Sequence, residues 1–226
     1  MKTFVRIFFS SLSFIFFFAG GAYSQQFNAG VSGGLLASDL VGLDPYDTDF
    51  NKAGFTFGGL VNLHIAPKDL LQFELYYIQK GSNQLPDSGN NYFETFKLNL
   101  DYIEGALLYK HRIPVIVNKK PLDRIELEIG PSLGNRIRIA QTSTAIGFFD
   151  DSQYKKTDFG INLGVAYYLS PNLYFDVRYF TSIIPVAKRS AVNSYYTVST
   201  WNNGDNVAFI FTLKYLFKAV EQTSAQ

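Results

Sequence analysis

The chain has 226 residues, with 20 basic and 19 acidic side chains, two histidines and no cysteine. The near balance of charge excludes the basic surface by which a protein neutralises nucleic-acid phosphates. The lack of cysteine excludes disulfides, thiolate nucleophiles and cysteine-ligated metals, and two histidines leave few ways to build a histidine-rich metal site. We therefore predict no nucleic-acid partner and no cofactor. Aromatic residues make up 17% of the chain, which indicates a use for rings outside an ordinary soluble core.

Residues 1–24 have the layout of a secretory signal peptide. Lys2 and Arg6 form a basic start, an apolar run extends from Ile7 to Ala19, and Ala22-Tyr23-Ser24 supplies a small-x-small cleavage pattern. As a helix, the apolar run would span only ~20 Å, short of the ~30 Å hydrocarbon core of a bilayer. We therefore expect an exported protein whose mature chain begins near Gln25.

The rest of the chain alternates apolar and polar residues with a period of two, which is typical of β-strands. In residues 158–169 and 206–217, six of six residues on one face are apolar. Six further segments keep the same alternation, so the sequence predicts an all-β protein. The eight predicted strands lie at about residues 27–38, 55–65, 71–80, 97–112, 123–139, 158–169, 173–179 and 206–217.

The fourth of these segments changes phase at Ile103 and Glu104. Before that point the polar residues are odd-numbered, and after it they are even-numbered. We predict a β-bulge here, which would keep one face of the strand polar throughout. The residues that this bulge would place on the polar face are Lys97, Asn99, Asp101, Glu104, Lys110 and Arg112.

An eight-stranded closed sheet can turn its apolar face inward, as a lipocalin does, or outward to lipid. The uncharged apolar faces are about 11 residues long, or roughly 28 Å at ~3.3 Å per residue and ~40° tilt, which matches a lipid band. The connections at 66–69, 113–122 and 170–172 are mostly short, whereas those at 39–51, 81–91, 140–157 and 183–205 are long and polar. Short periplasmic turns opposite long extracellular loops are typical of outer-membrane barrels.

We therefore predict an eight-stranded antiparallel up-and-down transmembrane β-barrel over residues 25–217, followed by a short periplasmic tail at 218–226. The location that follows is the outer membrane of a Gram-negative cell, with outer-membrane lipid around the wall. The apolar face of the last strand ends at Phe217, which resembles the C-terminal signal read by the barrel-insertion machinery.

The polar faces would then line the lumen, and they carry charges of both signs. An eight-stranded barrel is just wide enough for side chains to fill it, and buried opposite charges must pair to offset their desolvation. We expect a fixed structural network rather than an ion or proton path. The expected lumen charges are Glu74, Lys80, Glu104, Lys110, Glu126, Glu128, Asp176 and Arg178, with Asp101, Arg136, Arg138 and Lys214 on the same face.

The two histidines bear on an enzymatic alternative, a lipid-modifying barrel with a histidine-based site at the extracellular rim. His64 lies just before Ala66-Pro67 and His111 just before Ile113-Pro114, so both are expected at the periplasmic end. A histidine-activated nucleophile at the usual rim is then not available. We predict no catalytic residues and no enzyme activity.

The first long loop contains Asp47-x-Asp49-x-Asn51, which matches the start of an EF-hand loop. Lys52 stands in place of the required Gly, and Gly58 stands in place of the bidentate Glu. We expect a solvated acidic loop and no metal site.

The last long loop contains Tyr195, Tyr196 and Trp201. Exposed aromatic side chains are efficient contacts for a protein partner, and they also rest at the headgroup interface of a membrane. Both alternatives stay open for these three residues.

Four segments carry a family resemblance. They are LQFELYYIQKGS at Leu71–Ser82, LDYIEGALLYKHR at Leu100–Arg112, GPSLG within Ile129–Gly134 and DFGINLG at Asp158–Gly164. In their order and spacing they resemble the PorT-like outer-membrane β-barrel family of Bacteroidota, a porin-like family. Its members commonly show Tyr-x-Gln-Lys-Gly, Tyr-x-Glu-x-Pro-Leu-Leu-Lys, Gly-Pro-x-x-Gly and Asp-Phe-Gly motifs. One departure is Gly105-Ala106, where the family often has an apolar residue and Pro.

The resemblance implies an outer-membrane barrel, and its founding members are associated with secretion through the outer membrane. We expect a non-catalytic integral barrel with a structural or interaction role, possible contact with a protein partner through the long loops, and an accessory part in secretion. A small porin that passes ions or solutes is the main alternative.

Overall fold

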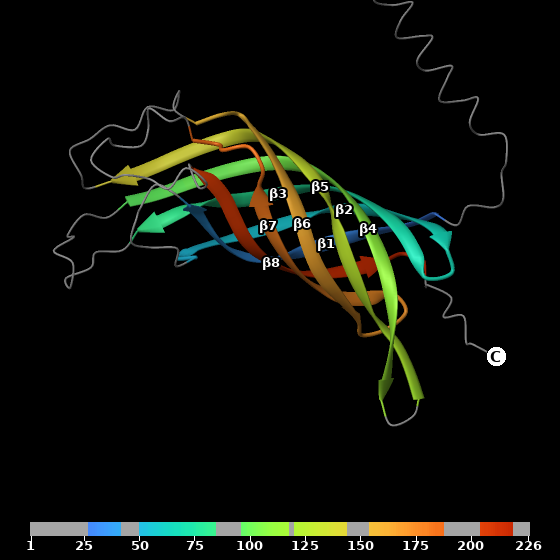
Figure 1. Ribbon diagram of the computed structural model, residues 1–226. Coiled ribbons are helices and arrows are strands. Elements are labelled where there is room, and N and C mark those ends of the chain that lie inside the picture. Colours follow the sequence, from blue (N-terminus) through green and yellow to red (C-terminus); the bar gives the residue numbers. More distant parts are fainter. Residues whose placement is uncertain are drawn as a thin grey trace, which may run out of the picture.

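The computed structural model describes residues 27–41, 50–84, 96–117, 120–143, 154–187 and 204–218. Each strand pairs antiparallel with the next, and β1 pairs with β8 to close the barrel (Figure 1). The predicted eight-stranded antiparallel barrel is therefore confirmed. The strands are β1 (Phe27–Val41), β2 (Lys52–Ala66), β3 (Asp69–Gln84), β4 (Phe96–Val117), β5 (Lys120–Ser143), β6 (Thr157–Tyr168), β7 (Leu173–Ser182) and β8 (Asp205–Leu216).

The two ends of the barrel differ in their connections. Residues 42–49, 85–95, 144–153 and 188–203 join strands at one end, which we call the loop end, and short connections join them at the other, which we call the turn end. No helix among the described residues is long and apolar enough to cross a membrane.

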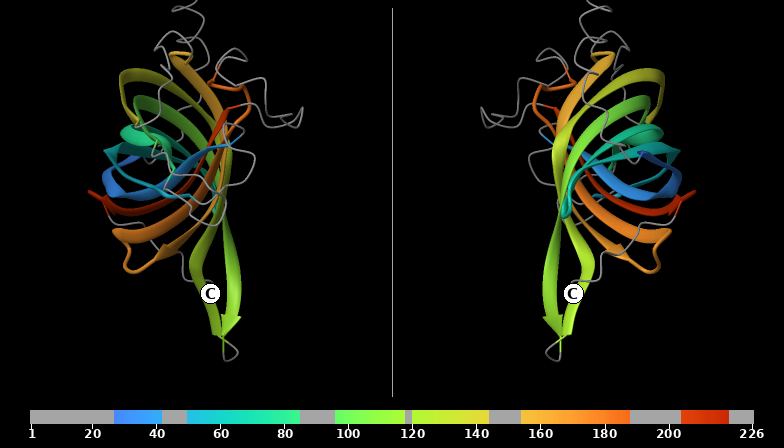
Figure 2. Two further views of the ribbon diagram at one scale, coloured as in Figure 1. Left: turned by 90° about the vertical axis from the view of Figure 1, so that its left-hand side faces the viewer. Right: turned by 90° about the vertical axis from the view of Figure 1, so that its right-hand side faces the viewer.

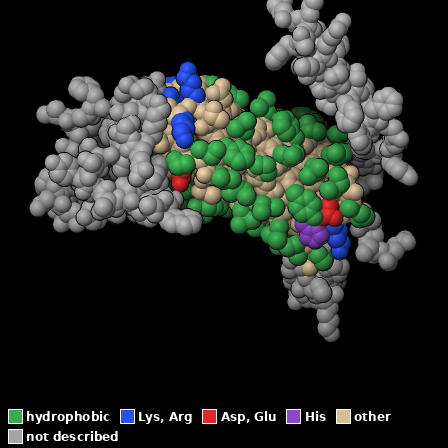
Figure 3. Space-filling view, turned by 45° about the horizontal axis from the view of Figure 1, so that its top comes forward, with side chains coloured by type: hydrophobic (Ala, Val, Ile, Leu, Met, Phe, Trp, Pro, Cys, Tyr) green, Lys and Arg blue, Asp and Glu red, His purple; other side chains and the backbone are tan. Residues whose placement is uncertain are grey.

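Apolar side chains cover the outer wall of the barrel. Along β8 the exposed residues are Phe209, Phe211, Leu213 and Tyr215, and the residues between them are buried. The same alternation on the other strands produces a broad apolar band between the two ends (Figure 3). An antiparallel sheet whose exposed face is the apolar one is suited to lipid rather than to water.

Aromatic rings gather on this outer wall toward each end. Toward the loop end, Tyr77 packs against Phe55 and Phe57 with ring centroids 5.4 and 5.3 Å apart. At the turn end, Tyr215 and Phe217 lie with their centroids 6.4 Å apart. Aromatic girdles at both edges of the apolar band are expected where a barrel wall meets the membrane interfaces.

The predicted bulge in β4 is wrong. All even-numbered residues of this strand from Leu98 to Lys110 are buried, without a change of phase. The side chains inside the barrel therefore change character along β4, from Leu98 and Leu100 near the loop end to Glu104 and Lys110 farther down. The alternation in sequence breaks at Ile103 because the interior changes from apolar to charged, not because the strand bends.

The bulge lies instead on β5, opposite that point. Asp101 pairs with Arg138 and Tyr102 with Arg136, so two residues of β5 oppose one step of β4. Below the bulge the even-numbered residues of β5 are buried, and above it Ile139 packs against the buried apolar cluster. The bulge turns Arg138 outward, with Asp101 beside it. Both residues were predicted to face the lumen, and that prediction is wrong.

The connection predicted at 113–122 is also wrong. β4 continues to Val117 and β5 begins at Lys120, with Val117 paired to Lys120. The two strands form a hairpin that projects beyond the barrel at the turn end (Figure 2). Pro114 falls where the register shifts, as expected for a residue without a backbone N–H to donate to its neighbour. The two prolines and the basic pair near the tip hid this extension in the sequence.

Candidate functional site

The centre of the lumen is built around Arg178 on β7. Its guanidinium binds Glu74 of β3 in a bidentate way, with N···O distances of 2.8 and 3.0 Å. The same group reaches Glu128 of β5 at 2.7 Å and Asp176 of its own strand at 3.3 Å. All four side chains are buried. A planar guanidinium with five donors is suited to hold three carboxylates at once.

Lys214 of β8 completes this group. Its ammonium lies 2.6 Å from Glu74 and 3.1 Å from Asp176. The Thr212 hydroxyl donates to the other oxygen of Asp176 at 3.2 Å. Lys214 was predicted on the lumen face, and the structure makes it the second cation shared by these carboxylates.

A second layer lies toward the turn end, around Glu126 of β5. Arg112 binds one of its oxygens at 2.7 Å, and the Tyr168 hydroxyl donates to the other at 3.1 Å. Lys110 lies 3.2 Å from Glu128 and 3.5 Å from Glu126, with its ammonium over the Tyr174 ring, 4.6 Å from the centroid. Aromatic faces add to the stabilisation of a desolvated cation.

The charges of these two layers balance. Four cations, Lys110, Arg112, Arg178 and Lys214, face four carboxylates, Glu74, Glu126, Glu128 and Asp176. Because each charge has a partner of opposite sign, their Coulomb attraction offsets the cost of removing all eight from water.

The network also crosses the lumen from wall to wall. β3 and β7 lie opposite each other, with three strands between them on either side. Arg178 on β7 meets Glu74 on β3 at 2.8 Å, and the Tyr174 hydroxyl on β7 donates to Gln72 on β3 at 3.0 Å. Contacts at hydrogen-bond distance between opposite walls leave no open passage at this level.

A separate polar cluster lies nearer the loop end. Lys80 of β3 is buried between Glu104 and Asp158, at 2.7 and 3.0 Å. Tyr76 donates to Glu104 at 2.7 Å, and Ser182 donates to Asp158 at 2.6 Å. The ammonium of Lys80 also lies over the Phe180 ring, 3.4 Å from its centroid. This lysine is thus held by two carboxylates and one aromatic ring, with its side chain fully buried.

Apolar side chains fill the lumen around and above this cluster. The buried residues there include Leu36, Leu40, Ile78, Leu98, Leu100, Val186 and Ala208. Val186 and Ala187 follow β7, and their backbone N–H groups donate to the Gly204 carbonyl at 2.9 and 3.2 Å. The loop end of the lumen is therefore closed by an apolar plug.

Glycines make room for the large interior side chains. A Cβ on Gly160 would collide with the Phe180 ring, and a Cβ on Gly164 would lie 2.8 Å from a Glu128 oxygen. Both glycines lie on the buried face of β6, where neighbouring side chains leave no room for a Cβ.

The structure thus places all eight predicted lumen charges, Glu74, Lys80, Glu104, Lys110, Glu126, Glu128, Asp176 and Arg178, inside the barrel. Sequence reasoning missed the part played by Asp158, Gln72 and Tyr174, which join the charged groups to opposite walls. Their positions on the buried face of each strand were a usable signal, but which residues meet across the lumen depends on strand stagger.

The histidines lie at the turn end, as predicted. His64 is near the end of β2, and His111 on β4 has its Nδ1 2.7 Å from the Asp69 carboxylate. Among the described residues, no three His, Asp or Glu side chains are grouped as a metal site would need. The predicted loop residues Tyr195, Tyr196 and Trp201, and Asp47 and Asp49, lie outside the described residues.

A charged interior, an apolar outer band and aromatic edges are the features of a β-barrel that spans a membrane. Comparison with known protein families leads to the same conclusion. The model of the family described as "Outer membrane protein beta-barrel domain" matches residues 23–188. The chain belongs to this family. It is an outer-membrane β-barrel protein, so the loop end is extracellular and the turn end periplasmic. No curated protein matches the chain.

Among solved structures, the chain is similar to Ail, the attachment invasion locus protein of Yersinia pestis, in complex with the heparin analogue sucrose octasulfate. The identity is 14%, the TM-score 0.44, and the match covers 85% of this chain and 99% of Ail. Neisserial surface protein A matches at 14% identity and a TM-score of 0.40, over 84% of this chain and 96% of the other.

Proposed function

We propose that this protein is a non-catalytic, non-conducting outer-membrane barrel that serves as a rigid platform for its extracellular loops. The observation that carries the proposal is the pair of contacts between opposite walls, Arg178 to Glu74 and Tyr174 to Gln72. Together with the apolar plug, they support a structural part for the lumen charges.

The long extracellular segments are the natural place for an interaction. A rigid scaffold that positions loops is a common arrangement for binding surfaces. Tyr195, Tyr196 and Trp201 are candidates for partner contact because exposed aromatic side chains contribute strongly to interfaces. The resemblance to the PorT-like family of Bacteroidota supports secretion through the outer membrane as the process in which such a partner acts.

Conductance separates this function from that of a small porin. The full-length protein, refolded into a planar bilayer, is expected to give no stable channels. Reproducible unitary currents that are lost when the protein is left out would contradict the closed lumen and favour the porin.

A deletion strain tests the interaction role. Loss of the protein is expected to reduce secretion of exported proteins without making the outer membrane permeable to small antibiotics. Complementation with a Tyr195→Ser, Tyr196→Ser, Trp201→Ser variant, with barrel insertion checked by heat-modifiable gel migration, should fail to restore secretion. Full restoration by this variant would remove these residues from the proposal.

A further inference from the structure

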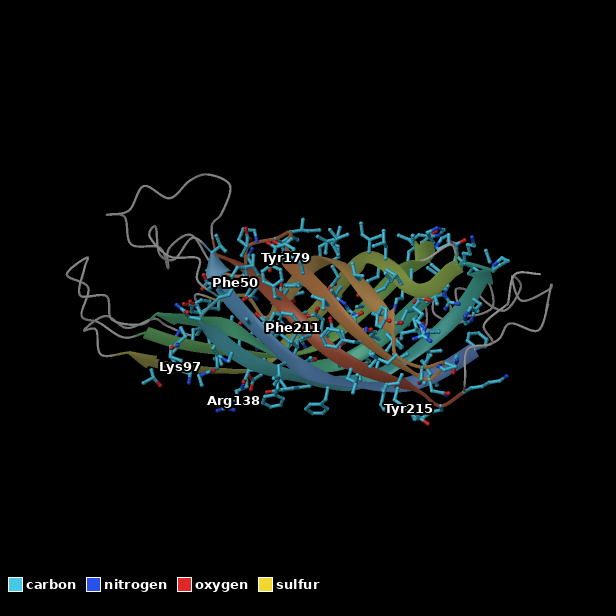
Figure 4. All side chains as sticks on the ribbon, turned by 90° about the horizontal axis from the view of Figure 1, so that it is seen from below. Phe50, Lys97, Arg138, Tyr179, Phe211 and Tyr215 are labelled. Atoms are coloured by element: carbon cyan, nitrogen blue, oxygen red, sulfur yellow. The ribbon has the colours of Figure 1, made fainter. Side chains whose placement is uncertain are left out.

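The outer wall of β4 and β5 carries a group of charges just above the apolar band. Arg138 points away from the barrel with 65% of its side chain exposed, and Lys97 on the neighbouring strand is also exposed. Figure 4 shows both near the loop end, on the same side of the barrel. Neither side chain belongs to the lumen network described above.

One carboxylate faces these cations. Asp101 is nearly buried under its neighbours, 3.6 Å from the Arg138 guanidinium and 3.3 Å from the Gln79 amide nitrogen. The Tyr77 hydroxyl is hydrogen-bonded to the same carboxylate. Asp101 thus orients Arg138 from one side and leaves most of the guanidinium facing outward.

Positive charge exceeds negative charge here. Among the described residues, Lys97 has no ion-pair partner. Lys52, at the start of β2, lies close enough that burial first, and then the positive charge of Lys97, lower its pKa. Lys52 itself is buried, so the exposed group consists of two cations, Lys97 and Arg138, against the carboxylate of Asp101, which leaves a local charge of 2 − 1 = +1.

The position of Lys97 and Arg138 at the upper edge of the apolar band indicates the kind of ligand that would fit them. Directly below it, Ile103 and Ile137 are exposed on the same two strands, and the Phe55, Phe57 and Tyr77 rings pack beside them. A ligand that fits both parts needs an anionic head and apolar chains. Phosphate groups suit such a site because arginine binds them with two parallel hydrogen bonds, and lysine adds a point charge.

We propose that Lys97 and Arg138 form a binding site for the phosphorylated headgroup of an anionic lipid in the outer leaflet, whose acyl chains lie over Ile103 and Ile137. The β5 bulge is what creates the site, because it turns Arg138 from the lumen to the lipid side. The site holds a lipid beside the barrel and fixes the height of the wall in the membrane.

Native mass spectrometry of the full-length protein in detergent tests the site, with diphosphorylated lipid A as the probe and phosphatidylcholine as the neutral comparison. The protein is expected to retain lipid A in preference to phosphatidylcholine. A cation near a membrane surface contributes about 1 kcal/mol, so the Lys97→Gln, Arg138→Gln double variant should bind lipid A about 30-fold more weakly.

Two variants make the result specific. Arg124→Gln removes an exposed arginine of the periplasmic hairpin and should leave lipid A binding unchanged. Asp101→Asn removes the competing carboxylate and should tighten lipid A binding. A variant that merely disturbs the fold would instead bind lipid A more weakly. Heat-modifiable migration confirms that each variant is folded.

Three outcomes would overturn the proposal. They are wild-type lipid A affinity in the double variant, an equal loss in Arg124→Gln, and release of bound lipid A by inorganic phosphate alone. The last would mean that the two cations bind free phosphate and that the apolar chains contribute nothing.

Discussion

The two halves of β4 show the same strand built for two different surroundings. Toward the periplasm, its outer face carries Leu107 and Tyr109 and its inner face carries Glu104 and Lys110. Toward the extracellular loops, the inner face carries Leu98 and Leu100, and the outer face carries Asn99 and Asp101. On this strand the wall is thus apolar outside and charged inside toward the periplasm, and polar outside and apolar inside toward the extracellular loops.

This difference shows how the two solvents shape one wall. In lipid, the outer face must be apolar, and the narrow lumen can hold charges only if they pair. Above the membrane, water surrounds the wall, and an apolar interior gives the hydrophobic stabilisation of a soluble barrel. The polarity exchange between Ile103 and Asp101 therefore marks where β4 leaves the hydrocarbon layer.

The largest effect is expected from breaking the central network in the membrane half. Arg178→Gln removes the one cation that contacts Glu74, Glu128 and Asp176 together, among the described residues, and should lower the free energy of unfolding by about 3–5 kcal/mol. Equilibrium denaturation of the barrel in lipid vesicles measures the change. Arg178→Lys keeps the positive charge and should lower the free energy of unfolding by less than Arg178→Gln does. A loss below about 1 kcal/mol, as for an exposed pair, would mean that water reaches this part of the lumen.

A pair of outward-facing substitutions tests the boundary itself. Leu107→Lys puts a cation in the apolar band and should destabilise the protein by about 2–4 kcal/mol, whereas Asn99→Lys, above the band, should cost about 0–1 kcal/mol. The two positions lie on one strand and one face. Equal losses in vesicle-based denaturation would remove the distinction between the two halves.

A glycine substitution tests how tightly the upper half is packed. Gly160→Ala forces a methyl group against the Phe180 ring, which lies over Lys80, and overpacking of this kind should cost about 1–3 kcal/mol. Gly33→Ala is the matched control, because no atom lies within 4 Å of its added Cβ. Similar unfolding free energies for both variants would indicate a loosely filled interior near the loop end.

The smallest effect is expected at the periplasmic edge. Asp69 accepts hydrogen bonds from His111 and from Tyr109. Both lower the pKa of its carboxyl group, and the bond from His111 contributes more. A carboxyl group whose pKa is lower in the folded protein stabilises it at pH values above the pKa of the unfolded chain, which is about 4. That stability is lost as the pH falls through the folded-state pKa. Asp69→Asn should therefore weaken the barrel slightly at neutral pH and have no effect in strong acid. A penalty that persists unchanged in acid would assign the effect to something other than the charge.

Strand number, order and most inward-facing charges could be predicted because the alternation of residues along each strand is local. The faces of β8 follow directly from the positions of Phe209, Phe211 and Leu213. The loop end misled the prediction because one rule, apolar outward, was applied to the whole length of β4. Above the membrane the opposite rule holds, and Leu98 and Leu100 point inward.

Cross-lumen partners could not be predicted from sequence. Which carboxylate meets Arg178 depends on the stagger of strands β3, β5 and β7, which no single segment encodes. The bulge on β5 was equally hidden, because Ile137 and Arg138 differ in polarity yet share the outer face.

Solvent accessibility at two positions of β4 tests the account most directly. Spin labels attached to Asn99→Cys and Leu107→Cys variants, in a chain that has no other cysteine, report collisions with a water-soluble nickel complex and with oxygen in lipid. The label at 107 should collide with oxygen and that at 99 with nickel. The same collision pattern at both positions would contradict a wall that changes its outer face within a single strand.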